Sequence, residues 1–130
     1  VTDRGGLQDT QTFTITVANV NDAPFFTSTP VTTTQSGTLY TYDVTTDDPD
    51  LDWGDVLTIT APTLPAWLTL TDHGDATATL TGTPTADDAG EHNVELHVTD
   101  SGGLIATQVF TITVDATYRI YLPLVLRNKS

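Results

Sequence analysis

The chain has 130 residues, 17 of them acidic and 4 basic, which gives a formal net charge of −13. Such an acidic surface cannot neutralise phosphates, so the composition argues against nucleic-acid binding and makes cations the expected partners. Cysteine is absent, which excludes disulfides, thiolate metal sites and cysteine nucleophiles, and no stretch reaches the ~18 apolar residues of a membrane-spanning helix.

The first residues repeat a later part of the chain. Residues 1–17 match residues 98–114 at thirteen of seventeen positions, with a constant offset of 97 residues. An offset of this size is one domain length. We therefore expect residues 1–18 to be the C-terminal hairpin of a preceding, truncated repeat. Two strands alone are marginal in water, so this hairpin needs cover from the sandwich of its own chain or from a neighbouring molecule.

Threonine alternates with apolar residues along most of the chain, as in residues 13–17 and 110–114. This period of two is typical of half-buried strands, and no segment keeps a helical period. The pattern predicts an all-β fold, an antiparallel Greek-key β-sandwich of about seven strands, Ig- or cadherin-like, with extra N- and C-terminal strands. The expected strands are at about residues 11–18, 25–34, 38–45, 56–61, 67–71, 77–82, 91–99, 105–115 and 118–126.

The domain boundaries follow from this pattern. Residues 19–24 are the expected linker, 25–115 a complete domain, and 116–130 an apolar, basic tail. The alternation predicts which side chains face the core, and Trp67 and Leu68 are expected to close one end of it. The predicted core residues are Tyr40, Tyr42, Val44, Leu57, Ile59, Val94, Leu96, Val98, Phe110, Ile112 and Val114.

The loop at residues 47–55 (DDPDLDWGD) carries five carboxylates between two predicted strands. Alternate side chains in such a loop can converge on one point. Calcium takes 6–8 oxygen ligands, so the loop suits calcium. Zinc and copper are not expected, because neither cysteine nor a nearby histidine is present.

Several motifs occur in the order that one known family shows. They are residues 19–26 (NVNDAPFF), 48–50 (DPD), 64–68 (LPAWL), 81–84 (TGTP) and 98–103 (VTDSGG). The first resembles the cadherin linker D-x-N-D-N-x-P-x-F, although it is one residue shorter and begins with asparagine. Together they resemble the cadherin superfamily, and more closely its bacterial and dystroglycan-type branch.

The resemblance implies a calcium site at the junction between repeats. By that likeness Asn21 and Asp22 from the linker, Asp48 and Asp50 from the loop, and Asp100 from the later turn bind calcium, and the ion stiffens the linker. The other loop carboxylates are open between two roles, metal ligation and hydrogen bonding to the turn backbone, and the second is favoured. These are Asp47, Asp52 and Asp55.

The segment at residues 118–126 is the most apolar stretch of the chain, and three of the four basic residues lie in the last dozen residues of the chain. It predicts either an edge strand on its own domain or a strand donated to a neighbour's sheet. The expected binding residues are Tyr121, Leu122, Leu124, Val125 and Leu126.

The predicted function is that of a structural or adhesive repeat of a bacterial secreted or cell-surface protein. Its expected partners are neighbouring repeats or copies of the same protein, joined head to tail, which is a contact that propagates into a fibre; surface glycans are a further class. The alternative is a carbohydrate-binding or accessory module of a secreted enzyme, supported by Trp53 in an exposed loop. Catalysis is not expected, because no cleft for paired carboxylates and no serine nucleophile motif is evident.

Overall fold

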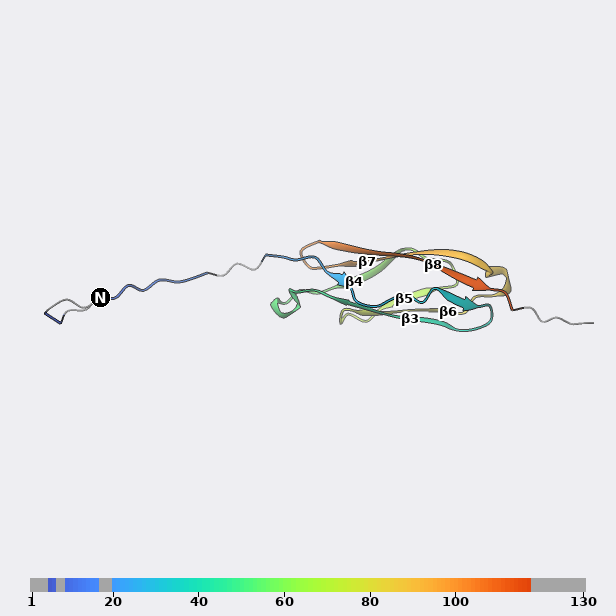
Figure 1. The fold of residues 1–130 in the computed structure, drawn as a ribbon, viewed down its shortest axis with the longest axis horizontal. Helices are drawn as coiled ribbons and strands as arrows, with labels where there is room; N and C mark the ends of the chain where they lie inside the picture. Colours follow the sequence, from blue (N-terminus) through green and yellow to red (C-terminus); the bar gives the residue numbers. More distant parts are fainter. Residues whose placement is uncertain (1–4, 7–8, 17–19, 118–130) are drawn as a thin grey trace, which may run out of the picture.

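The computed structural model describes residues 5–6, 9–16 and 20–117, and it folds into two packed four-stranded sheets (Figure 1). The first sheet has the order β1-β3-β6-β5 and the second β2-β8-β7-β4. Short 3-10 turns, η1 (Leu51–Trp53) and η2 (Ala86–Asp88), lie in two of the loops. The strands are β1 (Phe25–Phe26), β2 (Thr33–Gln35), β3 (Tyr40–Asp47), β4 (Thr58–Thr63), β5 (Thr69–Asp72), β6 (Thr77–Gly82), β7 (Gly90–Thr99) and β8 (Ile105–Asp115).

The predicted all-β sandwich is confirmed, and its core follows the period of two. In β3, buried and exposed residues alternate without a break, with Tyr40, Tyr42 and Val44 inside and threonine or aspartate outside. All of the predicted core side chains are buried, and Ala78 and Leu80 from β6 join them. Alternation works as a predictor here because each sheet has one face against the other sheet and one face toward solvent.

The buried tyrosines keep their hydroxyl groups hydrogen-bonded. Tyr42 Oη lies 2.7 Å from Ser28 Oγ and donates to Gln108 Oε1 at 2.9 Å, while Tyr40 Oη donates to the Val31 carbonyl. Burial raises the pKa of the Tyr40 hydroxyl, with a smaller contribution from Tyr42. These bonds pin the segment after β1 to the core.

Trp67 closes one end of the core as predicted, although its side chain stays half-buried. Its ring meets that of Tyr40 edge to face at 5.9 Å. Leu68 beside it is buried.

The strand predicted over residues 25–34 is two strands in different sheets. Phe25–Phe26 pairs antiparallel with β3, and Thr33–Gln35 pairs parallel with β8, so one pair departs from the predicted antiparallel arrangement. Pro30 lies between them, and proline has no N–H to donate to a ladder. The chain therefore crosses from one sheet to the other at the edge of the sandwich.

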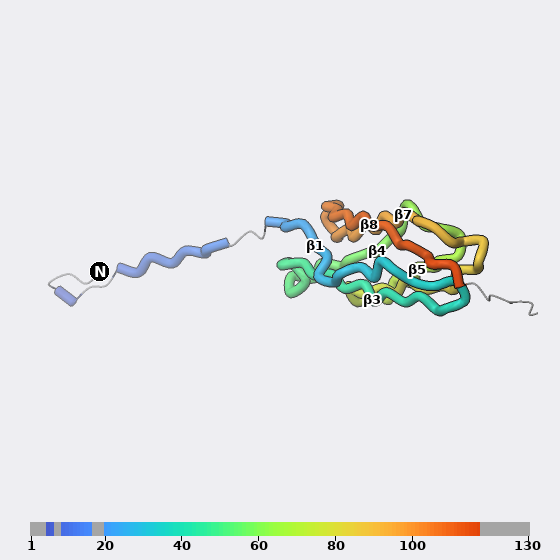
Figure 2. Tube along the Cα trace, turned by 45° about the vertical axis from the view of Figure 1, so that its right-hand side comes forward, coloured from blue at the N-terminus to red at the C-terminus, as the bar shows by residue number. Residues whose placement is uncertain are grey.

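The strand predicted at residues 11–18 is not formed by its described part. Residues 9–16 run away from the sandwich (Figures 1 and 2) and form no strand, and Phe13 and Ile15 are 72% and 74% exposed. A short segment alone cannot bury its apolar face. The predicted strand at 118–126, with Tyr121, Leu122, Leu124, Val125 and Leu126, lies outside the described residues.

Among the residues that the structure describes, no helix has the length and apolar character needed to cross a membrane.

Candidate metal centre

Two loops meet at the end of the sandwich where the linker enters. One loop joins β3 to β4 and carries Asp48, Asp50 and Asp55, and the other is the β7–β8 turn with Asp100. The first loop is folded by short local hydrogen bonds: the Asp50 amide donates to Asp48 Oδ1 at 2.8 Å and the Asp55 amide to the Asp50 carbonyl. Gly54 turns the chain back with a φ of 91°, a conformation that glycine adopts without strain.

The β7–β8 turn presents its aspartate in a similar way. The Leu104 amide donates to Asp100 Oδ1 at 2.8 Å, and the Asp100 amide donates to the Leu104 carbonyl. The Ser101 amide reaches across to Asp55 Oδ1 at 3.0 Å and so ties the two loops together.

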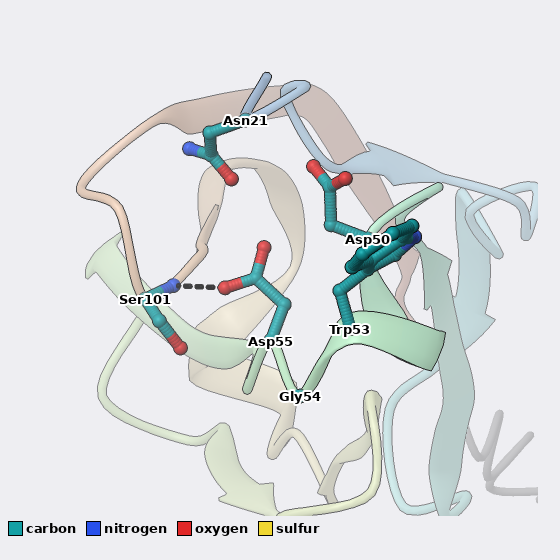
Figure 3. A pocket seen from close by; sticks show the side chains of 6 residues that line it. All are labelled: Asn21, Asp50, Trp53, Gly54, Asp55 and Ser101. Atoms are coloured by element: carbon teal, nitrogen blue, oxygen red, sulfur yellow. Dashed lines mark hydrogen bonds between the residues drawn. The ribbon is translucent and has the colours of Figure 1, made fainter. Parts of the chain in front are cut away.

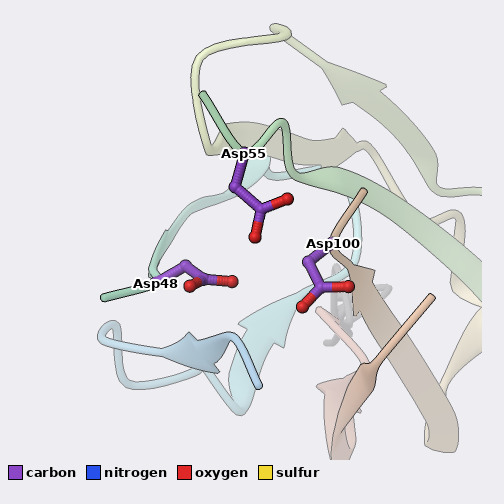
Figure 4. Close-up of side chains that lie close together, drawn as sticks. All are labelled: Asp48, Asp55 and Asp100. Atoms are coloured by element: carbon purple, nitrogen blue, oxygen red, sulfur yellow. The ribbon is translucent and has the colours of Figure 1, made fainter. Parts of the chain in front are cut away.

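Asp48, Asp55 and Asp100 point toward one another at this junction (Figure 4). One carboxylate oxygen of each lies within 4.8 Å of the corresponding oxygen of the others. We call these three residues the acidic triad. Asp48 and Asp100 are only 3% and 5% exposed, so bulk water screens their charges poorly.

Two oxygen atoms of the acidic triad are buried without a hydrogen-bond partner among the described residues, Asp48 Oδ2 and Asp55 Oδ2. Buried polar atoms are almost always paired, so an unpaired one requires an explanation. An unpaired carboxylate oxygen is costlier than a neutral group, because the charge itself is desolvated. A cation bound between these oxygens would remove that cost.

The electrostatics point the same way. Burial raises the pKa of the Asp48 carboxyl, and the neighbouring carboxylates of Asp55, Asp50 and Asp100 raise it further, against a lowering by the Asp50 amide hydrogen bond. The arrangement therefore disfavours the ionised state in which all these groups carry charge. A divalent cation would reverse this preference.

The linker is held against the same carboxylates. Asn21 Nδ2 donates to Asp100 Oδ2 at 2.9 Å, and the Asp22 amide donates to Asp50 Oδ2 at 2.6 Å. The linker thus contacts the site through donor groups, and Asp50 holds the linker in this structure. Both contacts hold Asn21 and Asp22 against the loops of the sandwich.

Because Gly102 has no side chain, the Asn21 side chain can lie directly against it. A Cβ at this position would lie 2.3 Å from Asn21 Nδ2. We expect Gly102→Ala to expel the Asn21 amide at little cost in folding, because a flexible side chain can move aside. The measurement is amide hydrogen exchange in the linker, which should quicken. Asn21→Ala should give the same change, and the double variant no more; additive effects would contradict this contact.

A small pocket of about 200 Å³ is lined in part by Asp55, one member of the acidic triad (Figure 3). Its wall combines carboxylates, an amide and a hydroxyl with the ring of Trp53, which is 63% exposed. The lining residues are Asn21, Asp50, Trp53, Gly54, Asp55 and Ser101.

The predicted ligand residues all lie at this junction, but they differ in their contacts. Asp48 and Asp100 belong to the acidic triad, Asp50 lies beside it, and Asn21 and Asp22 touch its surroundings as hydrogen-bond donors. Their role as metal ligands stays a prediction.

The other three loop carboxylates behave differently from one another. Asp47 Oδ1 accepts the Asp48 amide, which is the turn role expected of it, and Asp52 is exposed. For Asp55 the favoured role is hydrogen bonding to turn backbone; it accepts the Ser101 amide, and one of its carboxylate oxygens also lies within 4.8 Å of those of Asp48 and Asp100. Its position directly after Gly54, where the chain reverses, is the sequence signal for this.

The donor set fits a hard cation. The acidic triad brings three carboxylates together, which are oxygen donors of the kind that calcium prefers, and two of their oxygens are buried without a partner among the described residues. The buried acidic triad can therefore hold a metal ion, and backbone carbonyls and water would have to supply the remaining ligands of a calcium ion.

Comparison with known proteins places the fold in a family. A family model described as "Putative Ig domain" matches residues 23–115. No curated protein matches the sequence significantly.

Among solved structures, an endo-fucoidan hydrolase of glycoside hydrolase family 107 (MfFcnA4 H294Q) is 30% identical over 74% of this chain, with a TM-score of 0.62. The match covers only 14% of the hydrolase chain. The SrpA adhesin from Streptococcus sanguinis has a TM-score of 0.63 at 16% identity, over 77% of this chain and 60% of the adhesin. The second likeness concerns the fold alone.

Proposed function

Because the chain belongs to the "Putative Ig domain" family, we propose that it is an extracellular structural or adhesive module whose junction with a preceding repeat is stiffened by calcium. The observation that carries the proposal is the pair of orphaned carboxylate oxygens in the acidic triad, next to two hydrogen bonds from the linker. The finer likeness to cadherin-type repeats belongs to this proposal.

The stiffening has a simple physical basis. The acidic triad belongs to the sandwich, while Asn21 and Asp22 belong to the linker and contact Asp100 and Asp50. A bound ion neutralises the carboxylates that repel one another and holds both loops in place. Bending the linker would then break its hydrogen bonds to carboxylates that the ion holds in place, whereas without the ion these carboxylates repel one another.

The chain's first residues support a preceding repeat. Phe13 and Ile15 stand where Phe110 and Ile112 stand in the complete domain, at the offset of 97 residues. The later pair is buried, at 8% and 0% exposure, while the earlier pair is 72% and 74% exposed. We propose that the upstream repeat's own sheets cover Phe13 and Ile15. A neighbouring molecule in a strand-donated filament is the alternative cover.

The test is thermal unfolding of this chain in chelator and in millimolar calcium. A ligand that binds only the folded state stabilises it by about 2.7 kcal/mol at 100 times its dissociation constant, so the melting temperature should rise with calcium. Magnesium, which prefers stricter octahedral geometry, should act more weakly. Equal melting temperatures in chelator and calcium would sink the metal assignment.

A second candidate function rests on the 30% identity with part of a fucoidan hydrolase and on the exposed ring of Trp53 beside the pocket. It is that of a glycan-binding accessory module of a secreted enzyme. If this function is correct, an immobilised polysaccharide should retain the protein, and Trp53→Ala should abolish that retention. A structural module would pass through unretained.

A further inference from the structure

The strand β8 is paired with a neighbouring strand along one edge and mostly unpaired along the other, where the segment after β1 lies near it and Gln108 Nε2 donates to the Ser28 carbonyl at 3.2 Å. Along its whole length it pairs antiparallel with β7, from Ile105 to Val114. On the other side β2 pairs only with residues 113–115. Among the described residues, no strand pairs with residues 105–111 on that side.

The backbone groups along this edge are directed outward. The Thr113 amide donates to the Thr32 carbonyl at 2.8 Å, so the polar groups of Thr113 point away from β7. Backbone direction alternates along a strand, hence those of residues 105, 107, 109 and 111 point the same way. No backbone hydrogen bond within the described part of the chain satisfies them on that side. Such a row is a template for another strand.

The side chains along the open edge do not protect it. Ile105 and Val109 are 54% and 68% exposed. Residues 103–111 contain no charged residue and no proline, in a chain with 17 acidic residues. Natural sheets usually guard exposed edges with charges, proline, bulges or short strands.

The other edge strands of this sandwich carry such protective features. β4 contains Pro62 and a register shift between Thr60 and Thr63. β5 has four residues and ends in Asp72, while β1 and β2 have only two and three residues. The open edge of β8 is therefore the exception within this molecule.

We propose that this edge pairs with the same edge of a second copy of the chain, antiparallel and related by a two-fold axis at Thr107. In this register Thr107 faces its own copy, and Ile105 of each chain faces Val109 of the other. The contact makes two apolar cross-strand pairs from side chains that are exposed in one copy. Because the same surface serves on both sides, the contact closes into a dimer.

The register follows from the backbone. Only odd-numbered residues of β8 direct their N–H and C=O groups to the open side, so odd residues must pair with odd ones. Pairing 105 with 109 and 107 with itself meets this condition and also brings the apolar side chains together. The contact between the two β8 strands joins one four-stranded sheet of each copy into a single continuous sheet. This association is independent of the proposed calcium site.

Cysteine scanning tests the register directly, because the natural chain has no cysteine. In a hydrogen-bonded antiparallel pair the Cα atoms lie about 5.5 Å apart, within disulfide range. Under mild oxidation in chelator, Thr107→Cys should form a covalent dimer. Ile105→Cys and Val109→Cys should not form one separately but should do so when mixed. Thr41→Cys, exposed on the other sheet, is the control and should stay monomeric.

Sedimentation of the full chain tests the association without cross-linking. Val109→Lys should weaken dimerisation about tenfold or more, because it replaces both apolar Ile105–Val109 pairs by a charged side chain facing isoleucine. Leu39→Lys, at an equally exposed apolar position elsewhere, is the matched control and should leave it unchanged.

Three outcomes would overturn the proposal. They are a wild-type chain that stays monomeric, Thr107→Cys that dimerises no faster than Thr41→Cys, and dimerisation that is abolished by Phe13→Lys while Val109→Lys leaves it intact. The last result would assign the contact to the N-terminal segment. A calcium-independent melting temperature would refute the proposed function but not this dimer.

Discussion

Replacing Asp48 by asparagine is expected to stabilise the domain in chelator and to abolish its response to calcium. The Asp48 carboxylate is buried among other carboxylates, and its second oxygen has no partner among the described residues. An asparagine removes one charge and offers an amide that can donate to Asp55 or Asp100. In saturating calcium the variant should lack the roughly 2.7 kcal/mol that a ligand at 100 times its dissociation constant supplies. Urea unfolding in both conditions measures this crossover.

The pH dependence of the unfolding free energy provides a second test of the role of Asp48. The pKa of Asp48 is raised in the folded state, above its unfolded value. In chelator the cost of its ionised form is fully present above the folded pKa, and it is relieved as the pH falls through that pKa toward the unfolded value. The stability advantage of Asp48→Asn in chelator should therefore shrink as the solution is acidified. In calcium, acidification should instead weaken the wild type, because protons compete with the ion.

The matched control is Asp87→Asn. Asp87 is an exposed carboxylate on η2, which follows β6. The end of β6 pairs with the start of β3, whereas the acidic triad lies beyond the end of β3, so Asp87 is at the opposite end of the sandwich. The substitution removes the same charge but should leave the calcium response intact. A calcium shift that survives in Asp48→Asn would contradict the assignment of this residue as a ligand.

Gly82→Ala is expected to cost about 3 kcal/mol or more of folding free energy. A Cβ at Gly82 would lie 1.9 Å from the Trp67 carbonyl oxygen and 2.9 Å from its carbonyl carbon. Both atoms are backbone, so neither can rotate away, and β6 is held between β3 and β5. Overpacking of this kind costs 1–3 kcal/mol and occasionally more. At about 4–8 °C per kcal/mol for a domain of this size, the melting temperature should fall by more than about 12 °C.

Gly102→Ala is the control for this experiment. It also adds a methyl group at a glycine with a crowded Cβ position, but the nearest atoms belong to the flexible side chain of Asn21. Its melting temperature should change little. If Gly82→Ala melted close to the wild type, the close approach of β6 to the Trp67 backbone would be wrong.

The strand pattern and the core were predictable because they depend on local alternation. Each threonine–apolar repeat commits one face of a strand to the interior, and residues such as Tyr42, Leu96 and Ile112 are buried as the period of two requires. The acidic loop was equally visible, because its carboxylates are close together in the sequence. The repeat of residues 1–17 at 98–114 needs no coordinates at all.

The tertiary structure decided what depends on contacts between distant residues. The role of Asp55 emerges only when the β7–β8 turn brings Asp100 and the Ser101 amide to it. The split of residues 25–34 follows from where β3 and β8 lie, and the open edge of β8 from where β2 stops. The type of each residue indicates whether its side chain is stabilised by burial or by a neutralising charge. Which oxygens lack a partner, and which backbone groups lack a strand, is set by long-range packing that local periodicity does not encode.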